Sequence, residues 1–145
     1  MYLKGDPGDR VALLLERRPG MTADLEIIGS KRIAVCAPQG ALLVAERDVN
    51  DFMSEAMSLE ADWLLLPVSR LGPDFLRLRT RLAGEMAQKC STYRIGLAVV
   101  GDISEAVAAS DALRDFVRES NRGTQVWFAD DEAAFRKRLE DQVPA

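Results

Sequence analysis

The chain has 145 residues, 48% of them hydrophobic and 29% charged, and its formal net charge is −4. This length suits one domain with its own buried core, and the negative charge argues against nucleic acid as the main partner. No apolar run approaches the roughly 20 residues of a membrane span, and the lack of histidine excludes every Ser-His or Cys-His nucleophile system.

The N-terminal residues and the two cysteines bear on the limits of the domain and on its compartment. Residues 1–20 are rich in glycine and proline, so we expect an extension, either an edge element of the domain or residues ahead of a true start at Met21. Residues 21–145 are then one domain. Cys36 and Cys90 lie in apolar surroundings outside any CxxC pair, which predicts buried thiols in a reducing cytoplasm.

The first predicted elements are a β-hairpin, a helix and a strand. Two apolar runs, DLEIIG and RIAVCAP, meet at Gly29-Ser30, and a two-residue loop of this kind favours a hairpin. Apolar residues then recur every three or four positions over 48–61, which predicts an amphipathic helix with Asp48 as its N-cap. The near-continuous apolar run at 62–68 is typical of a strand that is covered on both faces.

A long helix and two further strand-helix steps complete the pattern. Residues 72–74 are expected to open a helix that runs to Tyr93. Its buried ladder is expected to be Leu78, Leu82, Met86 and Cys90. RIGLAVVGD predicts the next strand, 110–123 a helix capped by Ser110, and TQVWFAD and DEAAFRKRLE the last strand and helix. Strands that alternate with helices after one hairpin indicate the α/β class, with a mixed, mostly parallel sheet and right-handed crossovers.

Two stretches in the second half of the chain resemble a known bacterial family. AGEMAQKCSTYRIGLAVVGDIS at 83–104 and DFVRESNRG at 115–123 are similar to the family called domain of unknown function 4180, and the similarity extends over most of the chain from Met21 onward. Its helix motif falls on Ala83, Gly84, Glu85, Gln88 and Lys89. Arg81 stands where the family is expected to favour glycine, and Thr92 stands where asparagine is expected.

The order of the elements and the run RIGLAVVGD also resemble STAS-like domains, the group of the anti-sigma-factor antagonists. This resemblance implies a STAS-like fold and a protein that works by contact with a partner, although fold alone does not determine function. The antagonists carry a phosphorylatable serine in an Asp-Ser-Ser-Gly-like turn, but the turn here reads SRLGPD. Ser69 is therefore either a phosphorylation site or a plain loop serine, and the loop serine is favoured.

Two further features near strand ends have both a binding and a structural interpretation. Asp102 follows a predicted strand, where open α/β sheets place ligands, and it is equally well placed to cap the helix that starts near Ser104. Arg77, Arg79 and Arg81 resemble an anion site. Arg81, Glu85 and Lys89 are spaced by four residues and can pair along one exposed helix stripe, which favours a solvated face instead.

A polar cluster is expected where two of the predicted helices end. Glu119 lies near a helix C-terminus, which is unfavourable for an acid unless a positive group stands nearby. Crossover helices of a parallel sheet end at the same edge, so we expect Lys89 and Tyr93 to be the partners of Glu119 and Ser120. The candidate site residues are Glu85, Gln88, Lys89, Tyr93, Glu119, Ser120 and Asn121. Hydrogen-bonded struts are the favoured interpretation, and a working site is the alternative.

Two classes of function remain. The first is a non-catalytic binding or regulatory module of STAS-like kind, with an unidentified protein partner or small ligand and an open oligomeric state. The alternative is a small histidine-independent enzyme that uses Glu85, Lys89 or Tyr93, which requires a buried Glu or Lys. No P-loop, dinucleotide-binding or HExxH motif occurs, so we predict neither a cofactor nor a metal site. A pocket around the three side chains would favour the enzyme, and a flat apolar patch would favour the module.

Overall fold

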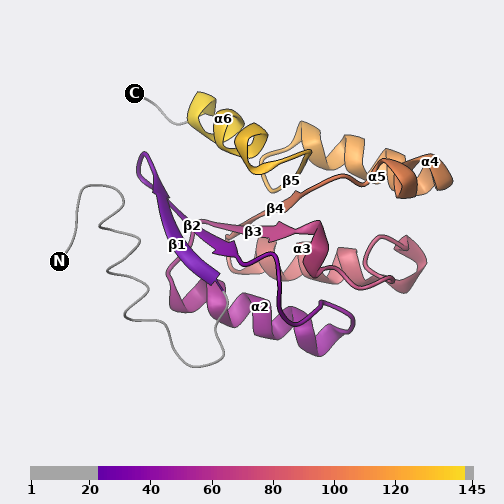
Figure 1. Cartoon of the computed structure of the whole chain (residues 1–145), viewed down its shortest axis with the longest axis horizontal. Coiled ribbons are helices and arrows are strands. Elements are labelled where there is room, and N and C mark those ends of the chain that lie inside the picture. The colour runs from indigo at the N-terminus through magenta and orange to yellow at the C-terminus, as the bar shows by residue number, and fades with distance from the viewer. Residues whose placement is uncertain (1–22, 143–145) are drawn as a thin grey trace.

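The computed structural model describes residues 23–142, so the predicted extension at 1–20 and the domain limit at residue 21 lie outside the described residues. The described strands form one sheet in the order β1-β2-β3-β4-β5 (Figure 1). They are β1 (Ala23–Ile28), β2 (Lys31–Cys36), β3 (Trp63–Pro67), β4 (Gly96–Val100) and β5 (Val126–Ala129). β1 and β2 are antiparallel, and every later pair is parallel. The predicted mixed, mostly parallel sheet of the α/β class is confirmed.

The N-terminal hairpin forms where the sequence predicts it. Ile28 pairs with Lys31 at its closed end, and Ala23 pairs with Cys36 at its open end. Gly29, the first residue of the two-residue loop, has a φ of 60°, a left-handed conformation that glycine adopts without steric cost. The strands therefore reverse at the position that suits a tight turn.

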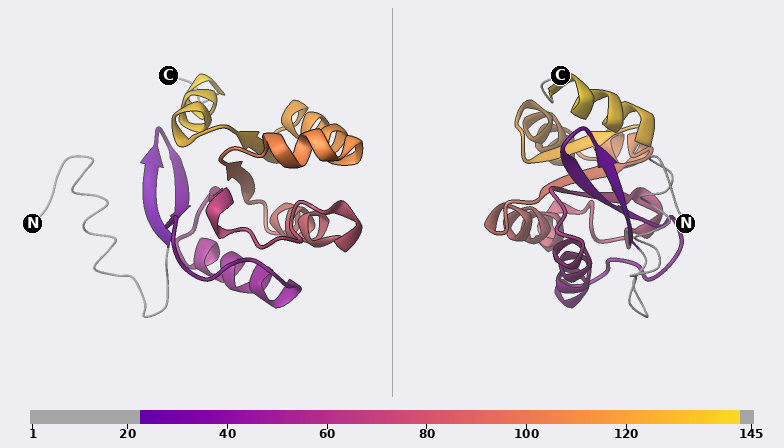
Figure 2. Two further views of the ribbon diagram at one scale, coloured as in Figure 1. Left: turned by 45° about the vertical axis from the view of Figure 1, so that its right-hand side comes forward. Right: turned by 90° about the vertical axis from the view of Figure 1, so that its left-hand side faces the viewer.

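The helices cover the two faces of the sheet unequally. They are α2 (Glu46–Ser58), α3 (Leu82–Thr92), α4 (Ser104–Ala109), α5 (Asp111–Arg122) and α6 (Glu132–Gln142). Because the parallel strands follow one another in sequence order, right-handed crossovers place α2, α3 and α5 on one face, and Figure 2 shows them stacked there. α6 packs on the other face. None of the described helices is long and apolar enough to cross a membrane.

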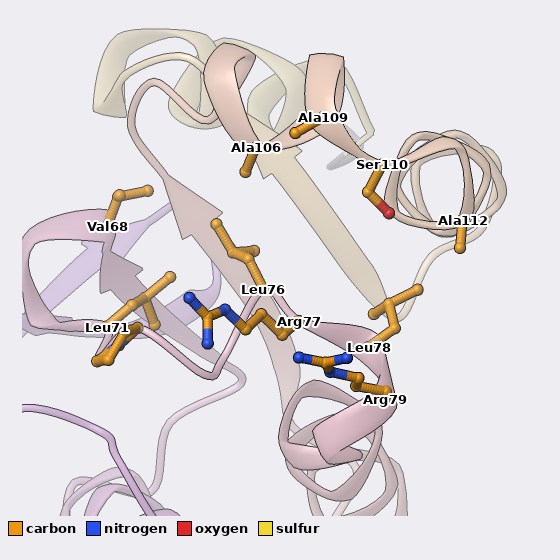
Figure 3. Close-up of a pocket in the computed structure, with 12 residues that line it drawn as sticks. Val68, Leu71, Leu76, Arg77, Leu78, Arg79, Ala106, Ala109, Ser110 and Ala112 are labelled. Atoms are coloured by element: carbon orange, nitrogen blue, oxygen red, sulfur yellow. The ribbon is translucent and has the colours of Figure 1, made fainter.

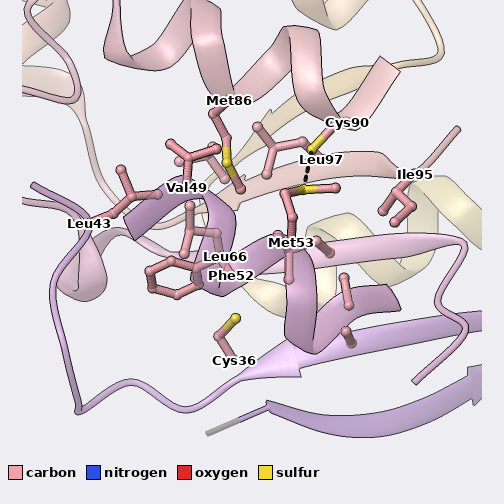
Figure 4. Close-up of a cluster of buried hydrophobic side chains, with 14 of the residues drawn as sticks. Cys36, Leu43, Val49, Phe52, Met53, Leu66, Met86, Cys90, Ile95 and Leu97 are labelled. Carbon is pink, nitrogen blue, oxygen red and sulfur yellow. Dashed lines mark hydrogen bonds between the residues drawn. The ribbon is translucent and has the colours of Figure 1, made fainter. Parts of the chain in front are cut away.

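Two hydrophobic clusters lie on the two faces of the sheet. Side chains alternate along β3, so Leu64 and Leu66 join the cluster under α2 and α3 (Figure 4), and Trp63 joins the cluster under α6. In the second cluster the Trp63 ring centre lies 4.4 Å from that of Trp127 and 5.4 Å from that of Phe135. Full burial of a side chain such as Phe135 contributes about 1.5 to 3 kcal/mol, so both clusters hold helices on the sheet.

α2 begins two residues earlier than predicted, so the assignment of Asp48 as N-cap is wrong. The N-cap residue is Ala45, and Asp48 is the third residue of the helix. Its Oδ2 accepts hydrogen bonds from the backbone N–H groups of Val44 and Ala45, each at 3.0 Å. An acid at this position reaches back to the residues before the helix, as the acid of a capping box does. The same residue therefore stabilises the helix start from a different position.

The helix predicted to run from 72 to 93 is wrong in its first half. α3 begins only at Leu82, and Arg81 before it has a φ of 66°, a left-handed conformation that interrupts a helix. The Thr80 hydroxyl lies 2.8 Å from each of two carbonyl oxygens, those of Asp74 and Arg77, which share its one proton, and this holds the segment as a loop. The later part of the predicted ladder is confirmed, because the structure buries Leu82, Met86 and Cys90.

Candidate functional site

A cleft with a volume of about 790 Å³ lies beside the carboxyl ends of β3 and β4 (Figure 3). One wall consists of Val68 and side chains between Leu71 and Arg79, in the segment that joins β3 to α3. The other wall consists of side chains from α4 and the start of α5. Cavities of this size with a mostly apolar lining are typical of small-molecule sites, so the cleft is the first candidate for function.

A buried arginine holds the segment after β3 in place. Arg70 is 2% exposed, its Nε donates to the Ala41 carbonyl at 2.7 Å, and its Nη1 donates to the Ala37 carbonyl at 2.9 Å. The guanidinium carbon lies 5.0 Å from the centre of the Phe52 ring, within the range of a cation–π contact. A buried cation is stable only with matched acceptors, so these contacts tie the start of the cleft wall to the loop after β2.

Gly72 allows the same two loops to touch. A Cβ atom on Gly72 would lie 2.4 Å from Cγ1 of Val44 and 3.0 Å from the carbonyl oxygen of Leu43. The N–H of Gly72 donates to that carbonyl at 3.0 Å. A side chain at this position would force the two loops apart, so backbone contact sets where the cleft wall lies.

Two arginines supply the charged groups of the loop wall. Arg77 and Arg79 line the cleft, and Figure 3 shows their guanidinium groups on the same wall as Leu76 and Leu78. Arg77 forms an ion pair of 3.6 Å with Asp74, but the two side chains are 60% and 50% exposed, so the pair is weak. Both guanidinium groups are therefore accessible to an anion that enters the cleft.

The opposite wall is made of small side chains and the start of α5. Ala106, Ala109 and Ala112 occupy little space and leave the cleft open. Ser110 is the N-cap of α5, as predicted, and its Oγ accepts a hydrogen bond from the N–H of Leu113 at 3.1 Å. The positive end of the α5 dipole thus borders the same cleft as the two arginines.

The polar side chains that line the cleft are those of two arginines and one serine. None of the residues that line it is an acid, a cysteine or a histidine, although acid–base catalysis needs such a group within reach of the substrate. Within residues 23–142 there is also no group of three or more Asp, Glu, Cys or His side chains that could hold a metal ion. The cleft offers apolar contact area and two cations to a ligand.

Four of the predicted site residues lie together on or beside α3, and none of them lines the cleft. They border a smaller hollow of about 300 Å³, which is lined by Glu46, Glu85, Gln88, Lys89, Thr92 and Tyr93. Glu85 and Lys89 are half-buried, and Tyr93 is 48% exposed. The structure brings these side chains together but buries none of them.

The predicted partnership between Glu119 and Lys89 is wrong. Glu119 Oε2 accepts a hydrogen bond from Nη1 of Arg122 at 3.0 Å, and both side chains are largely exposed. No hydrogen bond or ion pair within the described part of the chain joins Glu119 to Lys89. The positive group expected near Glu119 is therefore one turn away on α5 itself, where neighbouring side chains meet without bringing a second helix closer.

The other two residues of that motif, Ser120 and Asn121, lie on the last turn of α5. Oδ1 of Asn121 accepts a hydrogen bond from the N–H of Phe128 at 2.7 Å, which ties the end of α5 to β5. Its backbone carbonyl accepts a hydrogen bond from Nη2 of Arg138 on α6. Ser120 is half-buried beside it. Asn121 acts as a strut, whereas a working role for the cluster stays a prediction.

The two loop candidates both have structural partners. Ser69 Oγ donates to the Pro38 carbonyl at 2.6 Å and so bridges the loops after β2 and β3. Asp102 Oδ1 accepts from the N–H of Ser104 at 2.9 Å. Hydrogen bonds from the side chain and the backbone of Ser104 lower the pKa of Asp102. The loop-serine and helix-capping interpretations account for these contacts, and neither residue lines the cleft.

Both cysteines are buried, as the sequence predicts. Cys90 Sγ donates to Sδ of Met53 at 3.6 Å inside the cluster under α2 and α3 (Figure 4). Burial raises the pKa of Cys36 and that of Cys90 to about 12. A thiol with such a pKa stays protonated at neutral pH, so neither side chain is a nucleophile in the folded domain.

A comparison with protein-family models places the chain among related sequences. The model described as "Domain of unknown function (DUF4180)" matches residues 28–139, well over half of the chain. The chain belongs to this family. The resemblance carried by the two sequence stretches is thereby confirmed. Comparisons with curated proteins and with solved structures find no match, and the likeness to STAS-like domains stays a prediction.

Three motif positions of domain of unknown function 4180 can now be compared with the geometry. Arg81, where the family is expected to favour glycine, has the left-handed conformation that glycine tolerates best. Thr92, where asparagine is expected, donates from its Oγ1 to the Gln88 carbonyl at 2.9 Å. A Cβ atom on Gly84 would meet no other atom within 4 Å. A glycine at 81 has a backbone reason, whereas the glycine at 84 has no packing reason.

Sequence reasoning missed the cleft of this family member, because it assigned the loop wall to a helix. In LRLR at 76–79 apolar residues alternate with arginines, and this period of two does not suit a helix. That alternation is the signal that could have revealed a loop. Of the stripe predicted for Arg81, Glu85 and Lys89, only Glu85 and Lys89 lie within α3, because Arg81 is the residue directly before its first turn.

Proposed function

We propose that this domain is a non-catalytic binding or regulatory module of STAS-like kind, and that its binding site is the cleft between the β3–α3 segment and α4–α5. The observation that carries the proposal is a volume of about 790 Å³ lined by apolar side chains and two arginines, with no acid among them. The observed element order, a hairpin followed by helices that alternate with parallel strands, supports the STAS-like resemblance. Cys36 and Cys90, buried and unpaired, support a cytoplasmic location.

The construction of the loop wall supports a binding role. Arg70 and Gly72 anchor this wall through contacts to the loop after β2. It therefore keeps its shape without help from α4 and α5. A preformed wall lowers the cost of ordering that a ligand would otherwise meet on binding.

A thermal-shift screen against a metabolite library tests the proposal. A ligand at a hundredfold excess over its Kd stabilises the folded domain by about 2.7 kcal/mol and raises its melting temperature. We expect Ala109→Trp, which fills the cleft from α4, to remove the shift, and Ala133→Trp, at an exposed position of α6, to keep it. A shift that survives Ala109→Trp would place the site elsewhere. A library without a ligand, beside a specific partner in a pull-down, would contradict a small-molecule site.

The hollow around Glu85, Lys89 and Tyr93 supports a second candidate, a small histidine-independent enzyme. An acid, a base and a phenol border one volume there, as acid–base chemistry requires. A catalytic Glu or Lys commonly owes an altered pKa to burial, however, and these two are only half-buried. Lys89→Met separates the candidates: an enzyme would lose turnover, whereas the binding module would keep its cleft ligand.

A further inference from the structure

We propose that the cleft binds an elongated apolar anion, whose carboxylate meets Arg77 and Arg79 and whose chain passes Leu78 into the groove between α3 and α5. This inference rests on the proposed binding function and adds the chemical class of the ligand. Three features carry it: the charge of the cleft, its continuity with a second hollow, and a glycine that keeps that hollow open.

The cleft carries positive charge although the chain has a net charge of −4. Arg77 and Arg79 line it, and no acidic residue does. Arg77 has only a weak, exposed ion pair with Asp74, and the guanidinium of Arg79 has no ion pair or hydrogen bond with residues that the structure describes. A guanidinium presents planar donors that match both oxygens of a carboxylate. The charge of the ligand is therefore negative.

The facing wall adds to the positive potential. Ser110 and Ala112, at the start of α5, line the cleft, so the positive end of that helix lies at its border. The acid in the first turn, Asp111, does not line the cleft, and its Oδ1 lies 3.1 Å from Nη2 of Arg114. The carboxylate of Asp111 is thus paired within its own helix.

The apolar surface of the cleft continues beyond it. Leu78 lines the cleft and also lines a second hollow of about 450 Å³. Gly84 of α3 and Phe116 of α5 border the second hollow, and its remaining lining residues are Arg81, Glu85 and Gln88. The two hollows adjoin at the Leu78 side chain, and a ligand chain that lies over this side chain reaches from the arginines to the groove between these helices. An unbranched chain fits such a path better than a compact molecule does.

Gly84 leaves this groove open. Glycine within a helix is destabilising relative to alanine, so its presence in α3 needs a reason. A Cβ atom here would meet nothing within 4 Å, and the φ of Gly84 is not in the left-handed region. A side chain would instead enter the second hollow, which Gly84 borders. The glycine of the family motif is therefore explained by an occupant of the groove.

Calorimetric titration of the full chain with matched probes tests the charge. We expect octanoate to bind, and octylammonium, with the same chain length and the opposite charge, to bind at least about tenfold more weakly. The double variant Arg77→Gln/Arg79→Gln is expected to lose about tenfold or more in octanoate affinity. The control Arg118→Gln/Arg122→Gln removes two exposed arginines of α5 that do not line the cleft, and it keeps the affinity.

Dodecanoate tests the path. Each methylene that leaves water strengthens binding by up to about fourfold, so dodecanoate is expected to bind more tightly than octanoate. Gly84→Leu is expected to weaken dodecanoate by about tenfold or more and to leave octanoate unchanged. Ser91→Leu, at an exposed position of the same helix, is the control and changes neither. The melting temperature without ligand verifies that each variant is folded.

The outcomes separate this inference from the proposed function. If octanoate and octylammonium bind equally and Ala109→Trp abolishes both, the ligand need not be an anion. The cleft would remain the binding site. If Gly84→Leu does not alter dodecanoate binding, the ligand chain does not lie in the groove between α3 and α5. Octanoate binding that survives Ala109→Trp would remove the site from the cleft and overturn both proposals. Failure of every carboxylate to bind would overturn the ligand class.

Discussion

The loops after β2 and β3 meet in a packed region. A few residues later, the segment that follows β3 borders an open cleft. In the packed loop pair, residues 37–44 and 68–72, Arg70 is 2% exposed and donates to two carbonyl oxygens. In the cleft, the Arg77 side chain is 60% exposed and Arg79 stands beside it on the same wall. An arginine surrounded by acceptors of its own chain holds the fold, and one without them stays available to a ligand.

The glycines of the two regions show the same contrast. Gly72 belongs to the packed loop pair, where a Cβ atom would collide with Val44. Gly84 borders the second hollow, which adjoins the cleft at Leu78, and a Cβ atom there would meet nothing within 4 Å. Gly72 is required because two loops touch at its backbone, whereas Gly84 leaves the second hollow unfilled. Substitutions in the two regions should therefore have different consequences.

The largest expected effect is at the buried arginine. Arg70→Leu removes two charge-assisted hydrogen bonds and leaves the carbonyls of Ala37 and Ala41 without these donors, so we expect the free energy of unfolding to fall by about 3 to 5 kcal/mol. Urea denaturation followed by fluorescence of the buried tryptophans measures the change. The matched substitution Arg79→Leu should cost under about 0.5 kcal/mol. Equal losses of unfolding free energy for the two variants would show that the arginines of the packed loop pair and of the cleft do not differ in their structural role.

The next effect is expected at the two glycines. Gly72→Ala should lower the free energy of unfolding by about 1 to 3 kcal/mol, because its Cβ atom and Val44 cannot occupy the same space. Gly84→Ala should raise it by up to about 1 kcal/mol, because alanine is the better helix former and has room. Urea midpoints at constant slope report both values. A destabilised Gly84→Ala protein would show that the fold itself needs this glycine.

A smaller gain is expected at the residue before α3. Arg81 has a φ of 66°, and this left-handed conformation costs a residue with a side chain about 1 to 2 kcal/mol. Glycine would remove that strain, but its greater freedom in the unfolded chain offsets part of the gain in stability. Arg81→Gly should therefore raise stability by about 0.5 to 1 kcal/mol, seen as a higher melting temperature. Arg79→Gly, where φ is negative, should bring no gain. Similar shifts for both would mean that strain at Arg81 is not the cause.

The smallest effect is expected at Asp102, whose pKa in the folded domain is lowered from 3.8 by hydrogen bonds from Ser104. A lowered pKa means that the ionised form favours folding; this contribution is complete above the unfolded-state pKa and is lost as pH falls through the folded-state value. Asp102→Asn should be slightly less stable than the parent at pH 7, with a difference that shrinks below pH 3.8. Melting temperatures across pH, with Asp130→Asn as the control, measure this. A difference independent of pH would point to a lost contact and not to charge.

Local sequence patterns were sufficient for the elements whose cause is local. The turn at Gly29 forms because two residues can reverse the chain, and Ser110 caps α5 because a hydroxyl stands before a helical run. The buried thiol of Cys90 follows from its place in an apolar ladder. The pattern failed at 73–81, where Thr80 satisfies backbone carbonyls that a helix would otherwise have paired.

The candidate site was less predictable than the fold. The structure places Glu85, Lys89 and Tyr93 around one hollow, since helical spacing brings them to one surface. Sequence reasoning joined them to Glu119 on the assumption that two helix ends meet, but the partner of Glu119 is Arg122, three residues away. An exposed side chain pairs with a neighbour on its own helix more readily than with one on another helix, because less chain has to be ordered.

The sequence by itself determined the α/β class, the hairpin, the family, the burial of both thiols and the exclusion of histidine chemistry, because each depends on residue type or on spacing within one element. Only the tertiary structure decided that the segments around Arg79 and Ala109 face each other across a cleft. These segments follow different strands, and their approach depends on the parallel pairing of β3 with β4 and on the anchoring of the loop wall by Arg70. Such contacts join residues far apart in the chain, so no local pattern records them.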